Sequence, residues 1–129
     1  MPKRLPLLLC LFALAGCAPP RRQAEGVLKR IGADNLREGA ARLYKDFFAS
    51  SAPDYTSVKS SEWPSVFSAF APKQVGAYRD GFALALTLDG NTESGLYVIP
   101  AHMDVQPHAN PRARFERIAD GIYWYSFTR

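Results

Sequence analysis

Apolar residues in segment 25–48 recur at steps of mostly three and four positions, which predicts an amphipathic helix. The apolar positions are Leu28, Ile31, Leu36, Ala40, Leu43 and Phe47. Gly32 followed by Asp34 can end one helix and begin another, so the segment forms either one helix or a pair that divides near Gly32. We expect the charged side chains between the apolar positions to face solvent: Arg30, Arg37, Glu38, Arg42, Lys45 and Asp46.

After residue 73 the apolar positions recur at every second residue, which predicts β-strands. The clearest example is segment 82–88, where large apolar residues alternate with Ala and Thr, as a half-buried strand requires. The preceding Ser-rich segment, 49–64, contains the helix breakers Pro53 and Pro64. We interpret that segment as a loop or short turn.

Three Asp-Gly dipeptides separate the strand-like runs. Together with the Pro-rich segment after residue 99, they separate the runs 74–78, 82–88, 96–99, 114–118 and 122–127. Asp-Gly between alternating runs favours a tight hairpin, and strands joined by tight turns must be antiparallel. The sequence therefore predicts an α+β fold in which an N-terminal helix or helix pair packs on a small antiparallel meander sheet of about five strands.

Residues 1–20 have the organisation of a secretory signal peptide rather than of a folded domain. Lys3 and Arg4 precede an apolar run from Leu5 to Leu14, and small residues follow the run. A transmembrane helix needs about 20 apolar residues, so this run is too short to span a bilayer. We therefore expect the segment to direct export and to be removed.

The residues at the end of the apolar run, Leu14-Ala15-Gly16-Cys17, resemble the lipobox of bacterial lipoproteins. The resemblance implies that residues 1–16 are a lipoprotein signal peptide, that Cys17 carries an acyl lipid such as palmitate, and that 17–24 tether a single domain at 25–129 to the cell membrane. Ala18 stands where an Asp would retain a lipoprotein in the inner membrane, so the resemblance implies the outer membrane in a cell that has two. The alternative is an ordinary secreted protein that is cut near Ala18.

The charge of the chain bears on its partners, and its cysteine content bears on how the domain is stabilised. Removal of residues 1–16 takes away two of the 16 basic residues and leaves fourteen against 12 acidic ones. A nucleic-acid-binding protein needs a concentrated basic face, so we expect no nucleic-acid partner. Cys10 lies in the signal peptide and Cys17 is the lipidation site, so we expect the hydrophobic core alone to stabilise the domain.

Both histidines lie in one Pro-rich segment, 99–108, which is the candidate site for metal chemistry. His102 and Asp104 fall on one face of an extended chain, and His108 can join them as a third ligand for a zinc ion that also binds water. The segment also resembles the His-x-Asp-x-x-Pro motif of dinuclear zinc exopeptidases and deacylases, although the residues after it lack that family's Glu-Glu pair. The alternative interpretation is a Pro-stiffened connector.

Motifs for nucleophilic or phosphate chemistry are missing from the sequence. No Ser occurs in a Gly-x-Ser-x-Gly or Ser-x-x-Lys pattern, and no glycine-rich phosphate loop is present. We therefore predict that the protein is not an enzyme and uses no cofactor.

The C-terminal run offers an aromatic surface. Period two places Tyr123, Tyr125 and Phe127 on one face of the strand, with Ile122 and Trp124 on the other. One face meets the helix, and the other presents rings that suit a sugar or a partner protein. The candidate binding residues are Tyr123, Trp124 and Tyr125.

The favoured alternative is that the segment around Trp63, including Phe67 and Phe70, covers this second face. The sequence thus predicts a membrane-anchored envelope lipoprotein that acts as a non-catalytic module and binds an envelope protein or a cell-wall glycan. The alternative function is a metal-binding or metal-dependent hydrolytic lipoprotein that uses the loop with His102 and His108.

Overall fold

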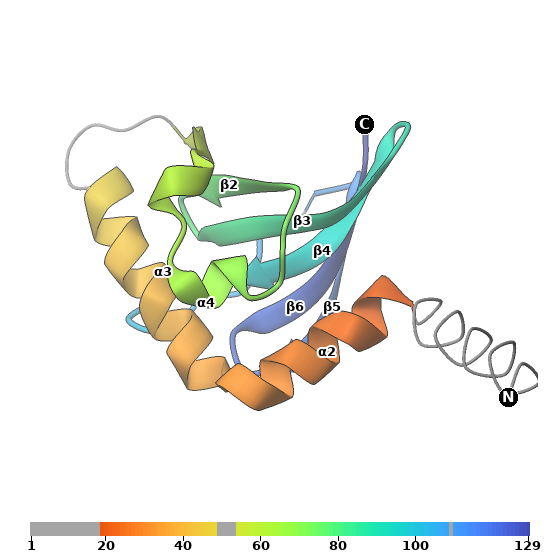
Figure 1. The fold of residues 1–129 in the computed structure, drawn as a ribbon. Helices are drawn as coiled ribbons and strands as arrows, with labels where there is room; N and C mark the ends of the chain where they lie inside the picture. The colour runs from red at the N-terminus through yellow and green to blue at the C-terminus, as the bar shows by residue number, and fades with distance from the viewer. Residues whose placement is uncertain (1–18, 49–53, 109) are drawn as a thin grey trace, which may run out of the picture.

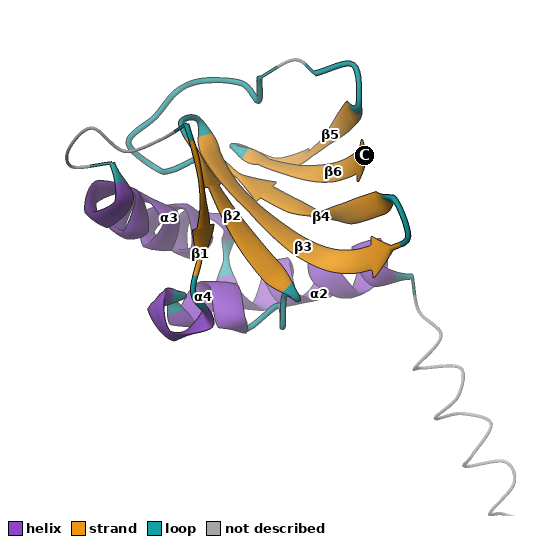
Figure 2. Ribbon diagram, turned by 90° about the horizontal axis from the view of Figure 1, so that it is seen from above, coloured by secondary structure: helices purple, strands orange, loops and turns teal. Residues whose placement is uncertain are grey.

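The computed structural model describes residues 19–48, 54–108 and 110–129. Within these residues the chain forms α2 (Pro20–Ile31), α3 (Ala33–Phe47), a 3-10 turn (Ser60–Glu62), α4 (Ser65–Ser68), and the strands β1 (Tyr55–Val58), β2 (Gln74–Tyr78), β3 (Gly81–Asp89), β4 (Thr92–Val98), β5 (Ala113–Ala119) and β6 (Ile122–Thr128). The labelled helices lie on one side of a strongly curved sheet, and none of the described residues forms a helix on the other side (Figures 1 and 2). The lipobox and Cys17 lie outside the described residues.

The sheet has the strand order β1-β2-β3-β4-β6-β5, and every neighbouring pair is antiparallel. The predicted α+β class and the antiparallel pairing are therefore confirmed. The expected simple meander is wrong at one place, because the segment between β4 and β5 carries the chain to the outer edge. Strand β6 then returns between β4 and β5.

The sheet contains six strands rather than about five, because β1 lies in the segment that we expected to be a loop. Its four residues pair with β2, and Val58 is buried in the core. The surrounding Ser and Pro residues hide this short run in the sequence. Strand β4 also begins earlier than expected, because a turn at Gly90 and Asn91 lets Thr92 pair with Asp89.

The predicted helix pair is present, and it divides at Gly32, whose φ of 86° favours glycine. Helix α2 begins at Pro20, so five residues expected in the tether are helical. Proline suits the first turn of a helix because a backbone N–H there has no intrahelical acceptor. A proline at this position therefore loses no hydrogen bond. Buried Ala24 and an ion pair between Arg21 and Glu116 of β5 hold this first part of α2 against the sheet.

The main hydrophobic core lies between the helices and the sheet. Phe67 of α4 is fully buried in it, Phe70 is buried beside it, and Trp63 packs against it. The expectation that these three residues cover the opposite face of the sheet is therefore wrong. They lie on the helix side, because α4 packs against α3 rather than crossing the sheet edge. The opposite face has its own smaller cluster, which includes Ala83 and Tyr97.

Arg37 also differs from the expectation, since we expected it to face solvent. Its side chain is only 13% exposed. The guanidinium donates hydrogen bonds to the backbone carbonyls of Ile99 (2.9 Å), Pro100 (3.3 Å) and Met103 (3.0 Å). Arg37 therefore fixes the start of the long segment between β4 and β5 onto α3.

No helix in the described ranges is both long enough and apolar enough to cross a membrane.

Candidate functional site: an aromatic pocket on the open sheet face

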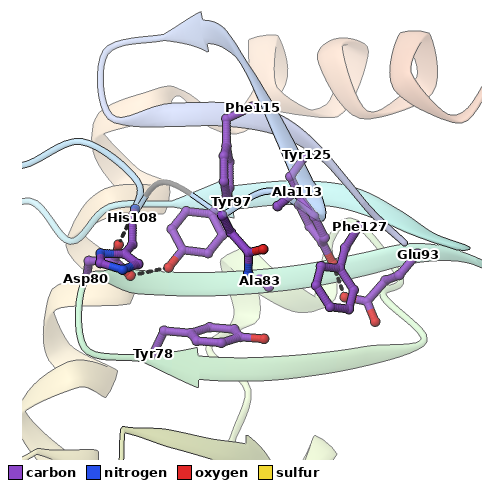
Figure 3. Close-up of a pocket in the computed structure, with 11 residues that line it drawn as sticks. Tyr78, Asp80, Ala83, Glu93, Tyr97, His108, Ala113, Phe115, Tyr125 and Phe127 are labelled. Carbon is purple, nitrogen blue, oxygen red and sulfur yellow. Dashed lines mark hydrogen bonds between the residues drawn. The ribbon is translucent and has the colours of Figure 1, made fainter. Parts of the chain in front are cut away.

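The sheet face opposite the helices is hollow in the middle because the strands there carry small residues. Gly76 of β2 pairs with Ala83 of β3, and both line the hollow. Large aromatic residues from β2, β4, β5 and β6 surround these positions (Figure 3). Together the small floor and the aromatic walls form a pocket of about 170 Å³.

The aromatic rings contact one another across the strands. The ring centroids of Tyr55 and Tyr78 lie 4.9 Å apart, and those of Tyr78 and Tyr97 lie 6.1 Å apart. Tyr97 also meets Phe115 at 5.2 Å and Tyr125 at 6.3 Å, both edge to face. Such tilted and edge-to-face pairs stabilise the ring positions, so the walls of the pocket are preformed.

One end of the pocket is polar because Asp80 lies there, in the turn between β2 and β3. The hydroxyl of Tyr97 donates a hydrogen bond to one carboxylate oxygen, and the backbone N–H of His108 donates to the other at 2.7 Å. Figure 3 shows the three residues grouped at this end. These bonds also fix the end of the segment between β4 and β5 beside the pocket.

The opposite end is polar because Glu93 of β4 points into it (Figure 3). Its side chain is only 13% exposed. The carboxylate accepts hydrogen bonds from the hydroxyl of Tyr125 at 2.6 Å and from the side-chain amide of Gln74 at 3.0 Å. Arg129 lies 3.5 Å away as an exposed ion-pair partner. Each end of the pocket thus holds one carboxylate that a tyrosine orients.

Three tyrosines of this face have raised pKa values, which favour the neutral phenol. Burial, together with Tyr55, Glu93 and Asp80, raises the pKa of Tyr78 to about 12. Burial and the hydrogen bond to Asp80 raise the pKa of Tyr97, and burial with the hydrogen bond to Glu93 raises that of Tyr125. The hydroxyl of Tyr78 therefore lies where both carboxylates contribute negative potential.

A second pocket of about 210 Å³ adjoins the first. The two share Tyr78, Ala83, Glu93 and Phe127 as lining residues, and the second extends to Tyr55 and Arg129. The hollow therefore continues along the open face toward β1 and the C-terminus.

The three aromatic residues of β6 that we predicted as binding residues lie in three different environments. Tyr125 is 3% exposed and lines the pocket. Tyr123 lies on the same face beside Phe115, at 6.5 Å between ring centroids, but it does not line the pocket. Trp124 lies on the opposite face and packs against the main core. Of the three candidate residues, only Tyr125 belongs to the pocket.

The three candidate metal ligands do not form a cluster. The ring of His102 packs edge to face against Tyr44 of α3 at 5.3 Å, whereas His108 lies beside Asp80 at the pocket. Asp104 is exposed between them. Across residues 19–48, 54–108 and 110–129, no three His, Cys, Asp or Glu side chains are grouped so that they could hold a metal ion.

The sequence analysis missed Asp80 and Glu93, because it assigned both to turns. A signal for Glu93 is present, since Glu93, Gly95 and Tyr97 alternate with the buried Leu96 and Val98. Extending this alternation toward the N-terminus would have placed Glu93 on the face that carries Tyr97. Asp80 gives no such signal, because its role depends on the distant Tyr97 and His108.

Comparisons of the chain with models of protein families, with curated proteins and with solved structures find no match. The function must therefore be argued from the site.

Proposed function

We propose that this protein is a lipid-anchored module of the bacterial cell envelope that binds a ligand without catalysis. The pocket on the open sheet face is the observation that carries the binding part of the proposal. A preformed concave site with apolar walls and a few oriented polar groups is typical of ligand binding. The lipobox and Cys17 support the anchored location, on the outer membrane in a cell that has two.

The polar groups of the pocket favour binding over acid-base or nucleophilic catalysis. Tyr97 and Tyr125 already donate their hydroxyl protons to Asp80 and Glu93. Burial and these carboxylates hold both phenols in the neutral form, whereas a tyrosine that acts as a base needs the phenolate. Each carboxylate also accepts two hydrogen bonds, which fix its position. We therefore propose that these groups orient a bound partner, either an envelope protein or a cell-wall component.

A metal-dependent function at the segment 99–108 is not favoured, since His102 packs against α3 and His108 lies at the pocket. A zinc ion would need both imidazoles and Asp104 in one coordination sphere.

Two labels test the proposal in intact cells. Metabolic labelling with radioactive palmitate tests the anchor, and we expect label in the wild-type chain but none in Cys17→Ala. A photo-crosslinking amino acid placed at Ala113, which lines the pocket, tests binding. The matched control carries the same group at Glu38, which is exposed on α3.

We expect the residue-113 probe to give a discrete adduct and the residue-38 probe to give none. Equal adducts at both positions, or none at residue 113, would overturn the binding proposal. Absence of palmitate from the wild-type chain would overturn the anchor without affecting the pocket.

A further inference from the structure

We propose that the aromatic pocket binds an ammonium group, primary or methylated, whose charge lies between the carboxylates of Asp80 and Glu93. The inference rests on the proposed binding function and specifies its ligand chemistry.

The walls of the pocket have the composition that a cation requires. The rings of Tyr78, Tyr97 and Tyr125 come from three different strands and lie around one hollow (Figure 3). The face of an aromatic ring carries negative charge density, so several rings around one site attract an organic cation. A neutral sugar would gain from the rings as well, but it would gain little from a net negative charge.

The charges at the two ends of the pocket select a cation over an anion or a neutral group. Asp80 and Glu93 point into the pocket from opposite ends, and both raise the pKa of the Tyr78 hydroxyl, so their fields overlap in the space between them. Arg129 pairs with Glu93, and its own side chain is 61% exposed. It opposes the two carboxylates in their effect on the pKa of Tyr78, but its effect is smaller than that of either carboxylate. The interior of the pocket therefore retains negative potential.

The size of the pocket suits a small organic cation. A cavity of about 150 Å³ holds one benzene molecule, so the observed 170 Å³ admits a butylammonium chain or a tetramethylammonium ion. It does not admit a folded segment. The pocket therefore suits a terminal ammonium group, such as that of a lysine-type side chain or of a methylated amine.

The test is an NMR titration of the full chain, purified in a neutral polyoxyethylene detergent, with four small probes. Butylammonium represents a primary amine and has butanol as its neutral counterpart. Tetramethylammonium represents a methylated amine and has tert-butanol as its counterpart. Backbone amide shifts of Ala83 and Tyr97 report binding in the pocket.

We expect at least one cation to bind saturably, with an affinity about tenfold or more above that of its neutral counterpart, and to weaken as salt is added. The cation that binds more tightly identifies the class of amine. Equal binding of cation and neutral counterpart would overturn the inference, and so would the absence of binding by both cations.

Variants locate the site. Glu93→Gln removes one charge, and Tyr78→Leu removes one ring from a side chain that is 38% exposed, so neither change empties the main core. We expect each to weaken cation binding about three- to tenfold, whereas Glu38→Gln on α3 leaves it unchanged. Unchanged binding in both pocket variants would overturn the inference.

The photo-crosslink at residue 113 separates the two proposals. A discrete adduct there without cation binding would retain the binding function and reject the ammonium as its ligand. Loss of both results would reject the binding function itself.

Discussion

Arg37 fills the space that a side chain at position 121 would need. A Cβ atom added to Gly121 would lie 2.3 Å from the Nε atom of Arg37, and the same Nε donates a hydrogen bond to the carbonyl of Ile99. The turn between β5 and β6, the helix α3 and the end of β4 thus meet at one guanidinium. The glycine is required both by its φ of 70° and by this contact.

Gly121→Ala is expected to destabilise the fold more than Gly90→Ala does. Both glycines have positive φ, but a Cβ at Gly90 would meet no atom within 4 Å. We expect Gly90→Ala to cost about 1 kcal/mol through backbone strain and Gly121→Ala to cost about 2–4 kcal/mol, because Arg37 must also move. Urea unfolding measures both values, and equal losses would show that the contact with Arg37 contributes nothing.

Arg37→Ala is expected to lower the free energy of unfolding by about 2–3 kcal/mol, because it removes charged donors from buried backbone carbonyls. Ile99 and Pro100 are buried, so water does not fully replace the donors. Arg42→Ala on the same helix is the control, since Arg42 is exposed and its loss should change stability by about 0.5 kcal/mol or less. Similar values for the two variants, measured by the same denaturant titration, would contradict the assigned role.

Alkaline titration should show that three tyrosines of the open face ionise above the ordinary pKa of a phenol. Tyr78, Tyr97 and Tyr125 have raised pKa values in the folded state, and that of Tyr78 is about 12. In the unfolded chain these phenols ionise near their ordinary pKa of about 10. Between these two values the unfolded state binds fewer protons than the folded state, so stability must fall as pH rises.

Absorbance at the phenolate band and the unfolding midpoint measure these effects. We expect three phenols to titrate together with unfolding, and Tyr125→Phe to reduce the loss of stability at high pH. Ionisation of Tyr78, Tyr97 and Tyr125 near pH 10 in the folded protein would contradict the raised pKa values.

Ala83→Val is expected to fill part of the pocket while leaving the fold stable. Ala83 lines the pocket on the open face, whereas Ala77 of β2 is fully buried in the main core. Two extra methyl groups at Ala77 have no free volume, so Ala77→Val should cost about 1–3 kcal/mol. Thermal unfolding compares the two variants, and a larger loss for Ala83→Val would show that the pocket is not free space.

The sequence contains enough information for the α+β class, because the change of period from helix to strand is local. The helix pair, the hairpin turns and the antiparallel pairing all follow from residues close together in the chain. The position of β5 at the sheet edge does not, since it depends on where the segment 99–112 crosses. The assignment of Arg37 to solvent failed for the same reason, because its acceptors lie more than 60 residues away.

The candidate site was predicted only at Tyr125. The period-two alternation of β6 shows which residues share a face of the sheet, but it does not show whether another part of the chain covers that face. Burial of Trp63 and Phe67 against the helices decides this question, and it depends on the tertiary packing of α4. The hollow itself arises where small residues of neighbouring strands coincide, which requires the strand register.

Alternate residues of one strand belong to different parts of this protein, the main core on one face and the pocket on the other. In β3, Phe82 and Leu84 form the main core, while Ala83 between them forms the pocket floor. Substitution of Ala83 can change the shape of the pocket without altering the volume of the main core. The pocket can therefore change its shape while the residues that maintain folding remain constant.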